Sequence, residues 1–214
     1  MSFVSFVFAT LSFLQTKPCF FCLLCVDFLP PKTPQKSLRW KRELGETIDP
    51  STLVVVASPF ARTLETATLA SSAVGIKGFQ NVSDEHNDED ARFSADEALR
   101  ERHFGGFELQ SHDHYRTVWV EDARDVNWRA PPASARGGDG KEGGGGGDRE
   151  GESVVDVAAR LRALFARLEA TYSNKNVLLV AHGDTLSIAT AVARGGGLGR
   201  HREHAQDTGE LRKL

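Results

Sequence analysis

The sequence has little of several features that would place it in a specialised class of protein. Its three cysteines lie together as Cys19, Cys22 and Cys25 in "CFFCLLC", no second cysteine pair follows, and no histidine occurs before His86. A tetrahedral zinc site would lack ligands, so we interpret the cysteines as apolar filling rather than as a metal or redox motif. Because the net charge is −3, the chain has no excess of positive charge and we expect no nucleic-acid partner.

The chain also lacks a hydrophobic run with the full length of a membrane span. Its densest apolar region, residues 1–31, contains "FVSFVFATLSFL" from Phe3 to Leu14, and Lys17 interrupts any longer stretch. Three interpretations stay open: the apolar part of a targeting signal, which no Lys or Arg precedes; a buried strand or helix; or a start that is not the authentic one. We treat residues 1–50 as a divergent apolar N-terminal segment and expect a cytoplasmic protein without membrane association.

The remaining chain, residues 51–214, has the pattern of one α/β domain. A composition of 40% hydrophobic and 26% charged residues over 214 positions suffices for a globular core. "TLVVVASP" at residues 52–59 and "NVLLVA" at residues 176–181 predict buried strands. Helical patterns follow each strand, and the clearest helix of the chain runs from Glu152 to Tyr172. Strands that alternate with helices predict a largely parallel sheet.

One segment interrupts this domain. "PPASARGGDGKEGGGGGDREG", from Pro131 to Gly151, holds nine of the 20 glycines and has almost no apolar side chains. Such a composition cannot offset the entropy of ordering. We expect a disordered, flexible insertion at residues 131–151.

Two of the predicted strands end in polar residues suited to an anion. "VVASPFAR" places Arg62 in the first turn of the next helix, and "VLLVAHGD" places His182 directly after the later strand. Ligands of parallel sheets bind beyond the carboxyl ends of the strands, where helix N-termini and arginines favour phosphate oxygens. The pair predicts a phosphate site, at which Gly183 would let a phosphate approach the backbone closely.

Four segments occur in an order that resembles a known family. These are "VVASPFARTLETA", "LRERHFGGFE", "GESVVDVAARL" and "VLLVAHGDTL", which together span Ser51 to about Gly195. They resemble the motifs of the histidine phosphatase superfamily, also called phosphoglycerate mutase-like. The resemblance implies a three-layer α/β sandwich with the helices on both faces of the sheet.

The resemblance also implies catalytic roles for three residues. Arg62 would hold the transferring phosphoryl group through charge-assisted hydrogen bonds. His182 would stabilise the charge that develops on the phosphoryl oxygens. Glu101 would protonate the leaving oxygen and later activate water. No metal or other cofactor is implied, because arginines and histidines supply the electrostatics.

Other matching residues would surround these three. Arg102 and His103 follow the mutase version of the motif and would contact a substrate carboxylate, with Gly183 beside the phosphate. Glu152 and Ser153, together with Ser58, would orient the site without touching the substrate. The expected partner is a small phosphorylated substrate, and the residues do not indicate an oligomeric state.

The family's nucleophile has no counterpart in this sequence. It is a histidine in an N-terminal strand that ends in Arg-His-Gly, and it forms a phosphohistidine. Residues 1–85 contain no histidine and the chain has no Arg-His-Gly, so we expect a first strand that is replaced or lost. The favoured function is a phosphomonoester hydrolase of a small metabolite, impaired by this loss. The alternatives are a phosphoglycerate mutase-like phosphotransferase and a catalytically dead phosphate-binding or interaction module.

Overall fold

The structure is a computed structural model that describes residues 20–25, 49–75, 92–108, 110, 113–136 and 148–214. Its centre is a sheet with the strand order β3-β2-β4-β1-β5. Neighbouring strands are parallel except at the β1–β5 edge, which is antiparallel. The strands are β1 Phe20–Cys25, β2 Leu53–Ala57, β3 Phe93–Ala95, β4 Asn176–Ala181 and β5 Leu211–Lys213. The predicted α/β class with a largely parallel sheet is confirmed.

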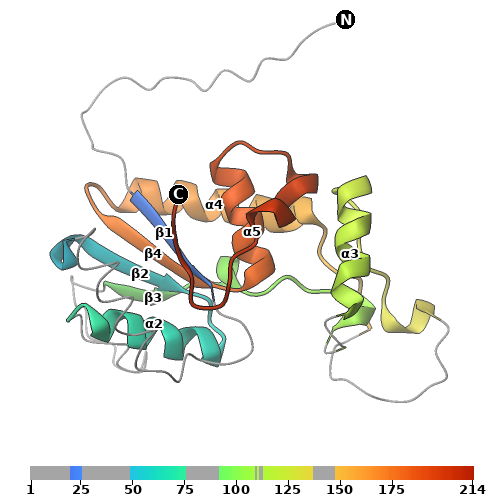
Figure 1. Ribbon diagram of the computed structural model, residues 1–214, viewed down its shortest axis with the longest axis horizontal. Coiled ribbons are helices and arrows are strands. Elements are labelled where there is room, and N and C mark those ends of the chain that lie inside the picture. The colour runs from blue at the N-terminus through green and yellow to red at the C-terminus, as the bar shows by residue number, and fades with distance from the viewer. Residues whose placement is uncertain (1–19, 26–48, 76–91, 109, 111–112, 137–147) are drawn as a thin grey trace, which may run out of the picture.

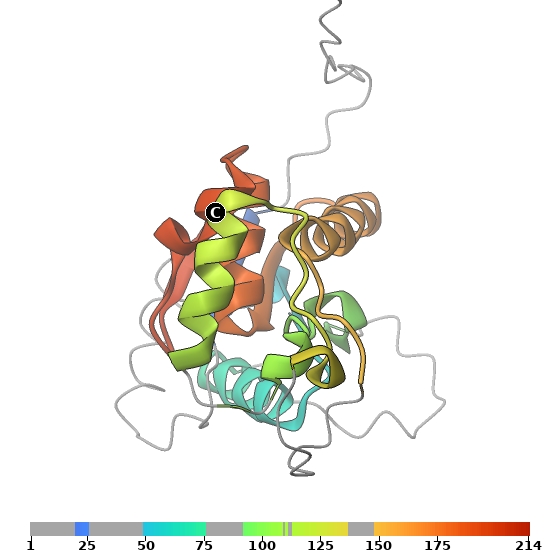
Figure 2. The same cartoon turned by 90° about the vertical axis from the view of Figure 1, so that its right-hand side faces the viewer.

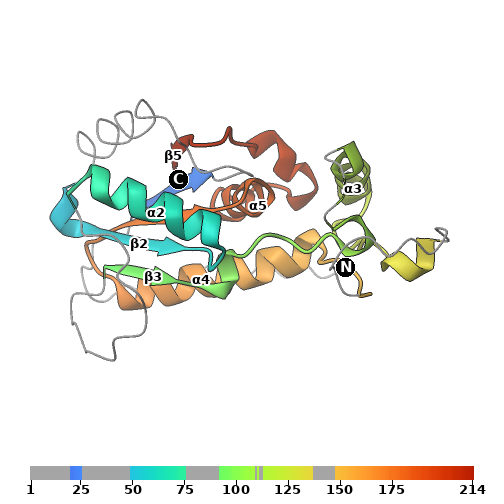
Figure 3. The ribbon, with the colours of Figure 1, turned by 90° about the horizontal axis from the view of Figure 1, so that it is seen from below.

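Helices cover both faces of this sheet, as Figures 1 and 3 show. Helix α2 (Ala61–Ala73) packs on one face, and α4 (Val154–Thr171) and α5 (Gly183–Ala193) pack on the other. Because side chains alternate along a strand, Val55 and Leu178 face α2 whereas Val56 and Leu179 face α4 and α5. Strands β2 and β4 are therefore buried on both sides, which explains their unbroken apolar sequences. The result is the predicted three-layer sandwich.

Strand β1 comes from an unexpected part of the apolar N-terminal segment. It is "FFCLLC", Phe20–Cys25, and lies between β4 and β5 with Leu23 fully buried. The position of a first strand is thus filled, and the alternative of a lost strand is wrong. "FVSFVFATLSFL", which we considered for this strand, lies outside the described residues.

Helix α3 (Asp113–Arg124) stands beyond the carboxyl ends of the strands, away from the three layers (Figures 1 and 2). A small hydrophobic core packs helix α3 against the loop that precedes it and the loop that follows it. The buried members of that core are Phe104, Phe107, Val118 and Ala130. Short 3-10 helices complete the described chain: η1 Pro50–Thr52, η2 Glu97–Leu99, η3 Gly105–Phe107, η4 Ala133–Arg136 and η5 Leu198–His204.

The Gly-rich insertion is narrower than predicted. Its first residues form η4, and its last residue, Gly151, is buried and donates its N–H to the carbonyl of Ala130 at 2.8 Å. The N–H of Gly106 reaches the carbonyl of Pro131 at 2.8 Å, and a Cβ at Gly105 would meet the Ala130 carbonyl at 2.5 Å. The expectation that no ordered element forms in residues 131–151 is wrong at both ends, and residues 137–147 lie outside the described residues.

Across the parts of the chain that the structure describes, no helix combines the length and the apolar character that a membrane crossing requires.

Candidate functional site

The structure brings Arg62, Glu101 and His182 together at the carboxyl end of the sheet. Strands β2 and β4 are parallel neighbours that pair Ala57 with Val180, so the residues that follow each strand meet at one edge. The Arg62 Nη2 atom lies 2.9 Å from His182 Nδ1. One carboxylate oxygen of Glu101, Oε2, lies 3.7 Å from the same nitrogen. Two residues from distant parts of the sequence, Arg62 and Glu101, therefore lie beside one nitrogen of the His182 imidazole.

His182 has one tautomer that fits its contacts. A guanidinium can only donate, so Nδ1 accepts from Arg62 and Nε2 carries the hydrogen. Nε2 then donates to Ser58 Oγ at 2.8 Å, so Ser58 contacts the nitrogen that Arg62 does not. The ring is fully buried, and the ring of Phe60 packs against it edge-on at 5.0 Å. Burial, with the positive charges of Arg62 and Arg160, lowers the pKa of His182 to about 3, so the imidazole is neutral at physiological pH.

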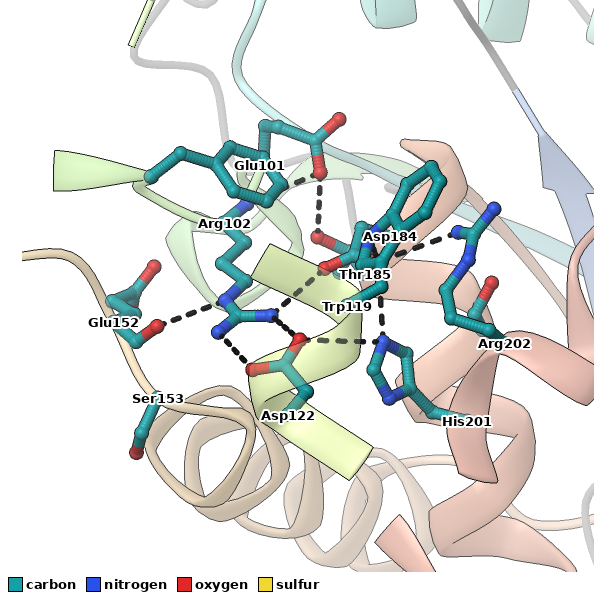
Figure 4. A network of polar contacts seen from close by, with 12 residues as sticks. Glu101, Arg102, Trp119, Asp122, Glu152, Ser153, Asp184, Thr185, His201 and Arg202 are labelled. Carbon is teal, nitrogen blue, oxygen red and sulfur yellow. Dashed lines mark hydrogen bonds and ion pairs between the residues drawn. The ribbon is translucent and has the colours of Figure 1, made fainter. Parts of the chain in front are cut away.

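The carboxylate of Glu101 is held by one oxygen. Its Oε1 atom accepts from Thr185 Oγ1 at 3.3 Å and from the backbone N–H of Arg102 at 3.1 Å (Figure 4). Thr185 also donates to the carbonyl of Arg100 at 3.0 Å, which ties this loop to the first turn of α5. The other oxygen, Oε2, is the one nearest His182. A carboxyl fixed in this way has the geometry of a general acid or base.

Glu152 supports the same loop from the side of α4. Its carboxylate accepts from Arg100 at 3.2 Å, from Arg160 at 3.1 Å and from the backbone N–H of His103 at 3.1 Å. Burial alone would raise the pKa of Glu152, but Arg160, the His103 N–H and Arg100 outweigh it and lower the pKa. Glu152 is thus an ionised anchor for the segment that carries Glu101.

Ser153 has a different environment from the one implied by the resemblance. It is the N-cap of α4, and it exchanges hydrogen bonds with Asp156 in a capping box. Its hydroxyl stabilises the start of the helix.

The guanidinium of Arg102 does not face a substrate position. It is 1% exposed and forms a bidentate pair with Asp122 at 2.6 and 2.8 Å. It also donates to Asp184 at 3.3 Å and to the backbone carbonyl of Glu152 at 2.8 Å. A buried guanidinium with these partners cannot turn to a substrate carboxylate without leaving the buried Asp122 without its bidentate partner. Arg102 therefore fixes the loop, and its backbone N–H serves Glu101.

Asp184 is the centre of a polar cluster that the sequence did not reveal. One oxygen accepts from Trp119 Nε1 at 3.1 Å, from His201 Nε2 at 3.3 Å and from Arg202 Nη1 at 3.3 Å (Figure 4). Burial would raise the pKa of Asp184, but the His201 hydrogen bond and the charges of Arg102 and Arg202 hold it far below its usual value. We call Arg102, Trp119, Asp122, Asp184, His201 and Arg202 the polar cluster.

Two further predicted residues lie at the edge of the site. His103 is partly buried, and its Nδ1 accepts from the N–H of Gly105 at 3.2 Å. Gly183 is the first residue of α5, directly after His182. The N–H groups in the first turn of a helix have no intrahelical acceptor and carry partial positive charge, which suits an anion.

Comparisons with known proteins agree with this geometry. The fold and the site define a class of protein: a three-layer α/β fold with a polar site at the carboxyl ends of β2 and β4. Residues 37–214 match the model of the histidine phosphatase superfamily (branch 1), so the chain belongs to that family. The match begins after β1, whose residues it does not include.

Solved structures share this fold at low sequence identity. A mycobacterial glucosyl-3-phosphoglycerate phosphatase is 20% identical over 92% of this chain and 88% of its own, with a TM-score of 0.59. A mycobacterial hydrolase is 20% identical over 91% and 87%, with a TM-score of 0.58. The protein YhfR of Bacillus stearothermophilus is 20% identical over 91% and 90%, with a TM-score of 0.56. No curated protein sequence is significantly similar to this chain.

Within the described residues, no group of three or more His, Cys, Asp or Glu side chains is placed to hold a metal ion.

Proposed function

We propose that this protein binds the phosphoryl group of a small phosphate monoester at Arg62 and His182. The observation that carries the proposal is the contact between Arg62 Nη2 and His182 Nδ1 at 2.9 Å, beside the first turn of α5. Arginine and helix N–H groups bind phosphate oxygens, and the neutral imidazole of His182 holds the Arg62 guanidinium by accepting its hydrogen bond. In this proposal Glu101, whose Oε2 lies 3.7 Å from His182 Nδ1, protonates the alcohol oxygen of the ester as it leaves.

In this proposal the reaction is that of a histidine-type phosphomonoester hydrolase, impaired in this chain. Such a hydrolase needs a nucleophile within reach of phosphorus. No histidine occurs before His86. Of the later histidines, His201 is buried in the polar cluster and His103 accepts a bond from Gly105. These features favour retained phosphate binding with slow turnover.

The similar solved structures favour a small phosphorylated metabolite as the class of substrate. One of the similar structures is a glucosyl-3-phosphoglycerate phosphatase, which is named for a small phosphorylated compound. The shared fold supports a phosphate ester in general rather than that particular compound.

The test is titration of inorganic phosphate into the protein at neutral pH by calorimetry. We expect Arg62→Ala to weaken binding at least about tenfold, because one charge-assisted bidentate contact contributes about 1.5–3 kcal/mol. The matched control is Arg162→Ala, which removes an exposed arginine from α4 and should leave binding unchanged. Equal affinity in the wild-type protein and Arg62→Ala would refute the proposed site.

A further inference from the structure

The cationic side chains around Glu101 are engaged by carboxylates of the protein itself. Arg102 is paired with Asp122 and Asp184, and Arg202 with Asp184. On the other side of the loop, Arg100 and Arg160 share the carboxylate of Glu152. In the polar cluster two carboxylates match two arginines, so this cluster has no net positive charge to offer a second anionic group of a ligand.

His201 adds to this internal compensation. Its Nδ1 faces the carbonyl of Leu198 at 3.0 Å and its Nε2 faces Asp184 at 3.3 Å, so both nitrogens point at oxygen acceptors. The second carboxylate of the polar cluster, Asp122, lies 3.9 Å from the same Nε2. The ring is fully buried and is thus committed to the protein's own oxygens.

Besides Trp119 and Asp122, helix α3 carries Tyr115 close to this region. Tyr115 packs on Phe104 with ring centroids 4.5 Å apart, one helical turn from Trp119, which donates to Asp184. Burial and the negative charges of Glu108 and Glu101 raise the pKa of Tyr115, so its phenol is neutral at physiological pH. A neutral phenol can bond an alcohol hydroxyl, but it offers no charge to a carboxylate.

We propose that the site selects phosphate monoesters of uncharged alcohols, and that Asp184 is the residue that determines this preference. A carboxylate close to the ester would approach the negative charges of Glu101 and Glu108, while the buried Asp184 keeps the neighbouring arginines of the polar cluster paired. This inference rests on the proposed phosphate site and names the class of ester that the site takes.

The matched ligand pair is glycerol 3-phosphate and 3-phosphoglycerate, which differ by a hydroxymethyl group against a carboxylate. We expect the wild-type protein to bind glycerol 3-phosphate about three to ten times more tightly than 3-phosphoglycerate. This is the effect expected when one uncompensated charge of the ligand lies close to like charges in a solvated site. Added salt should narrow the difference because it screens the repulsion. Calorimetry or competition against inorganic phosphate measures both affinities.

The variant Asp184→Asn tests the residue itself. It keeps the shape of the side chain and removes the charge that compensates Arg202 and part of Arg102. We expect the preference for glycerol 3-phosphate to disappear or reverse. The matched control is Glu121→Gln on α3, whose partner Arg124 is 70% exposed, and it should keep the wild-type preference.

Equal or tighter binding of 3-phosphoglycerate by the wild-type protein would overturn the inference, and this result needs no variant to fold. An unchanged preference in folded Asp184→Asn would overturn the role of that residue. If inorganic phosphate does not bind, or binds independently of Arg62, then the proposed phosphate site fails and the preference with it. If phosphate binding depends on Arg62 and the ligand order is reversed, the preference alone fails.

Discussion

We expect the protein with this sequence to hydrolyse a generic aryl phosphate at less than about 0.001 s⁻¹, roughly three powers of ten below the low end of ordinary turnover numbers. Arg62 supplies donors and charge for a phosphoryl group, His182 holds its guanidinium in place, and Glu101 supplies a proton. None of these replaces a covalent nucleophile, which divides one difficult transfer into two easier steps. Turnover near 1 s⁻¹ that vanished in both Arg62→Ala and His182→Ala would contradict this expectation and indicate a nucleophile elsewhere.

The end of β1 indicates how turnover should be restored. Cys25, the last residue of β1, pairs in parallel with Ala181, which directly precedes His182 in the sequence. We expect the triple variant Cys25→Arg/Val26→His/Asp27→Gly to raise turnover at least about 100-fold, since it restores the family's Arg-His-Gly sequence at this point of the chain. The matched control, Cys25→Arg/Val26→Asn/Asp27→Gly, should stay inactive. Equal rates in the two triple variants would show that a histidine at this sequence position does not act as the nucleophile.

The largest effect on stability is expected at Asp122. It forms both bonds of the bidentate pair with Arg102, and the two side chains are 0% and 1% exposed. Asp122→Ala leaves the guanidinium buried with Asp184 as its remaining carboxylate at 3.3 Å. Breaking a buried ion pair from one side typically costs about 3–5 kcal/mol of unfolding free energy. Denaturant unfolding of the purified variant measures this loss.

The control for that measurement lies one residue earlier on the same helix. Glu121 pairs with Arg124 on the surface, and Glu121→Ala should change the unfolding free energy by less than about 1 kcal/mol. If the two variants lost similar amounts of stability, the polar cluster would not hold α3 in the way that the contacts indicate.

The parts of the fold with strong local patterns could be predicted from the sequence. Strands β2 and β4 are unbroken apolar runs, and α4 shows apolar residues at three- and four-residue steps. Arg62 and His182 could also be placed, because each directly follows a predicted parallel strand and such strand ends meet at one edge. These predictions depend only on patterns among residues that are close together in the sequence.

Strand β1 and the polar cluster had no comparable local signal. "FFCLLC" is one apolar stretch within a longer apolar region, so its sequence has no alternation of polar and apolar residues that would mark the bounds of a strand. In the polar cluster, Arg102 finds Asp122 and Asp184 at separations of 20 and 82 residues. Because these buried ion pairs join residues far apart in the sequence, the sequence alone did not show that Arg102 fixes the loop and does not contact a substrate. The His-Gly-Asp sequence was the one available hint, since Asp184 follows the predicted site directly.

The central claim is that Arg62, His182 and the start of α5 bind a phosphoryl group. The most direct measurement is a crystal structure of the wild-type protein soaked with inorganic phosphate. The account predicts an anion within hydrogen-bond distance of the Arg62 guanidinium, beside the His182 ring, next to the first turn of α5 and on the side of Glu101 Oε2. An anion bound elsewhere, with Arg62 and His182 still in contact with each other at saturating phosphate, would contradict it.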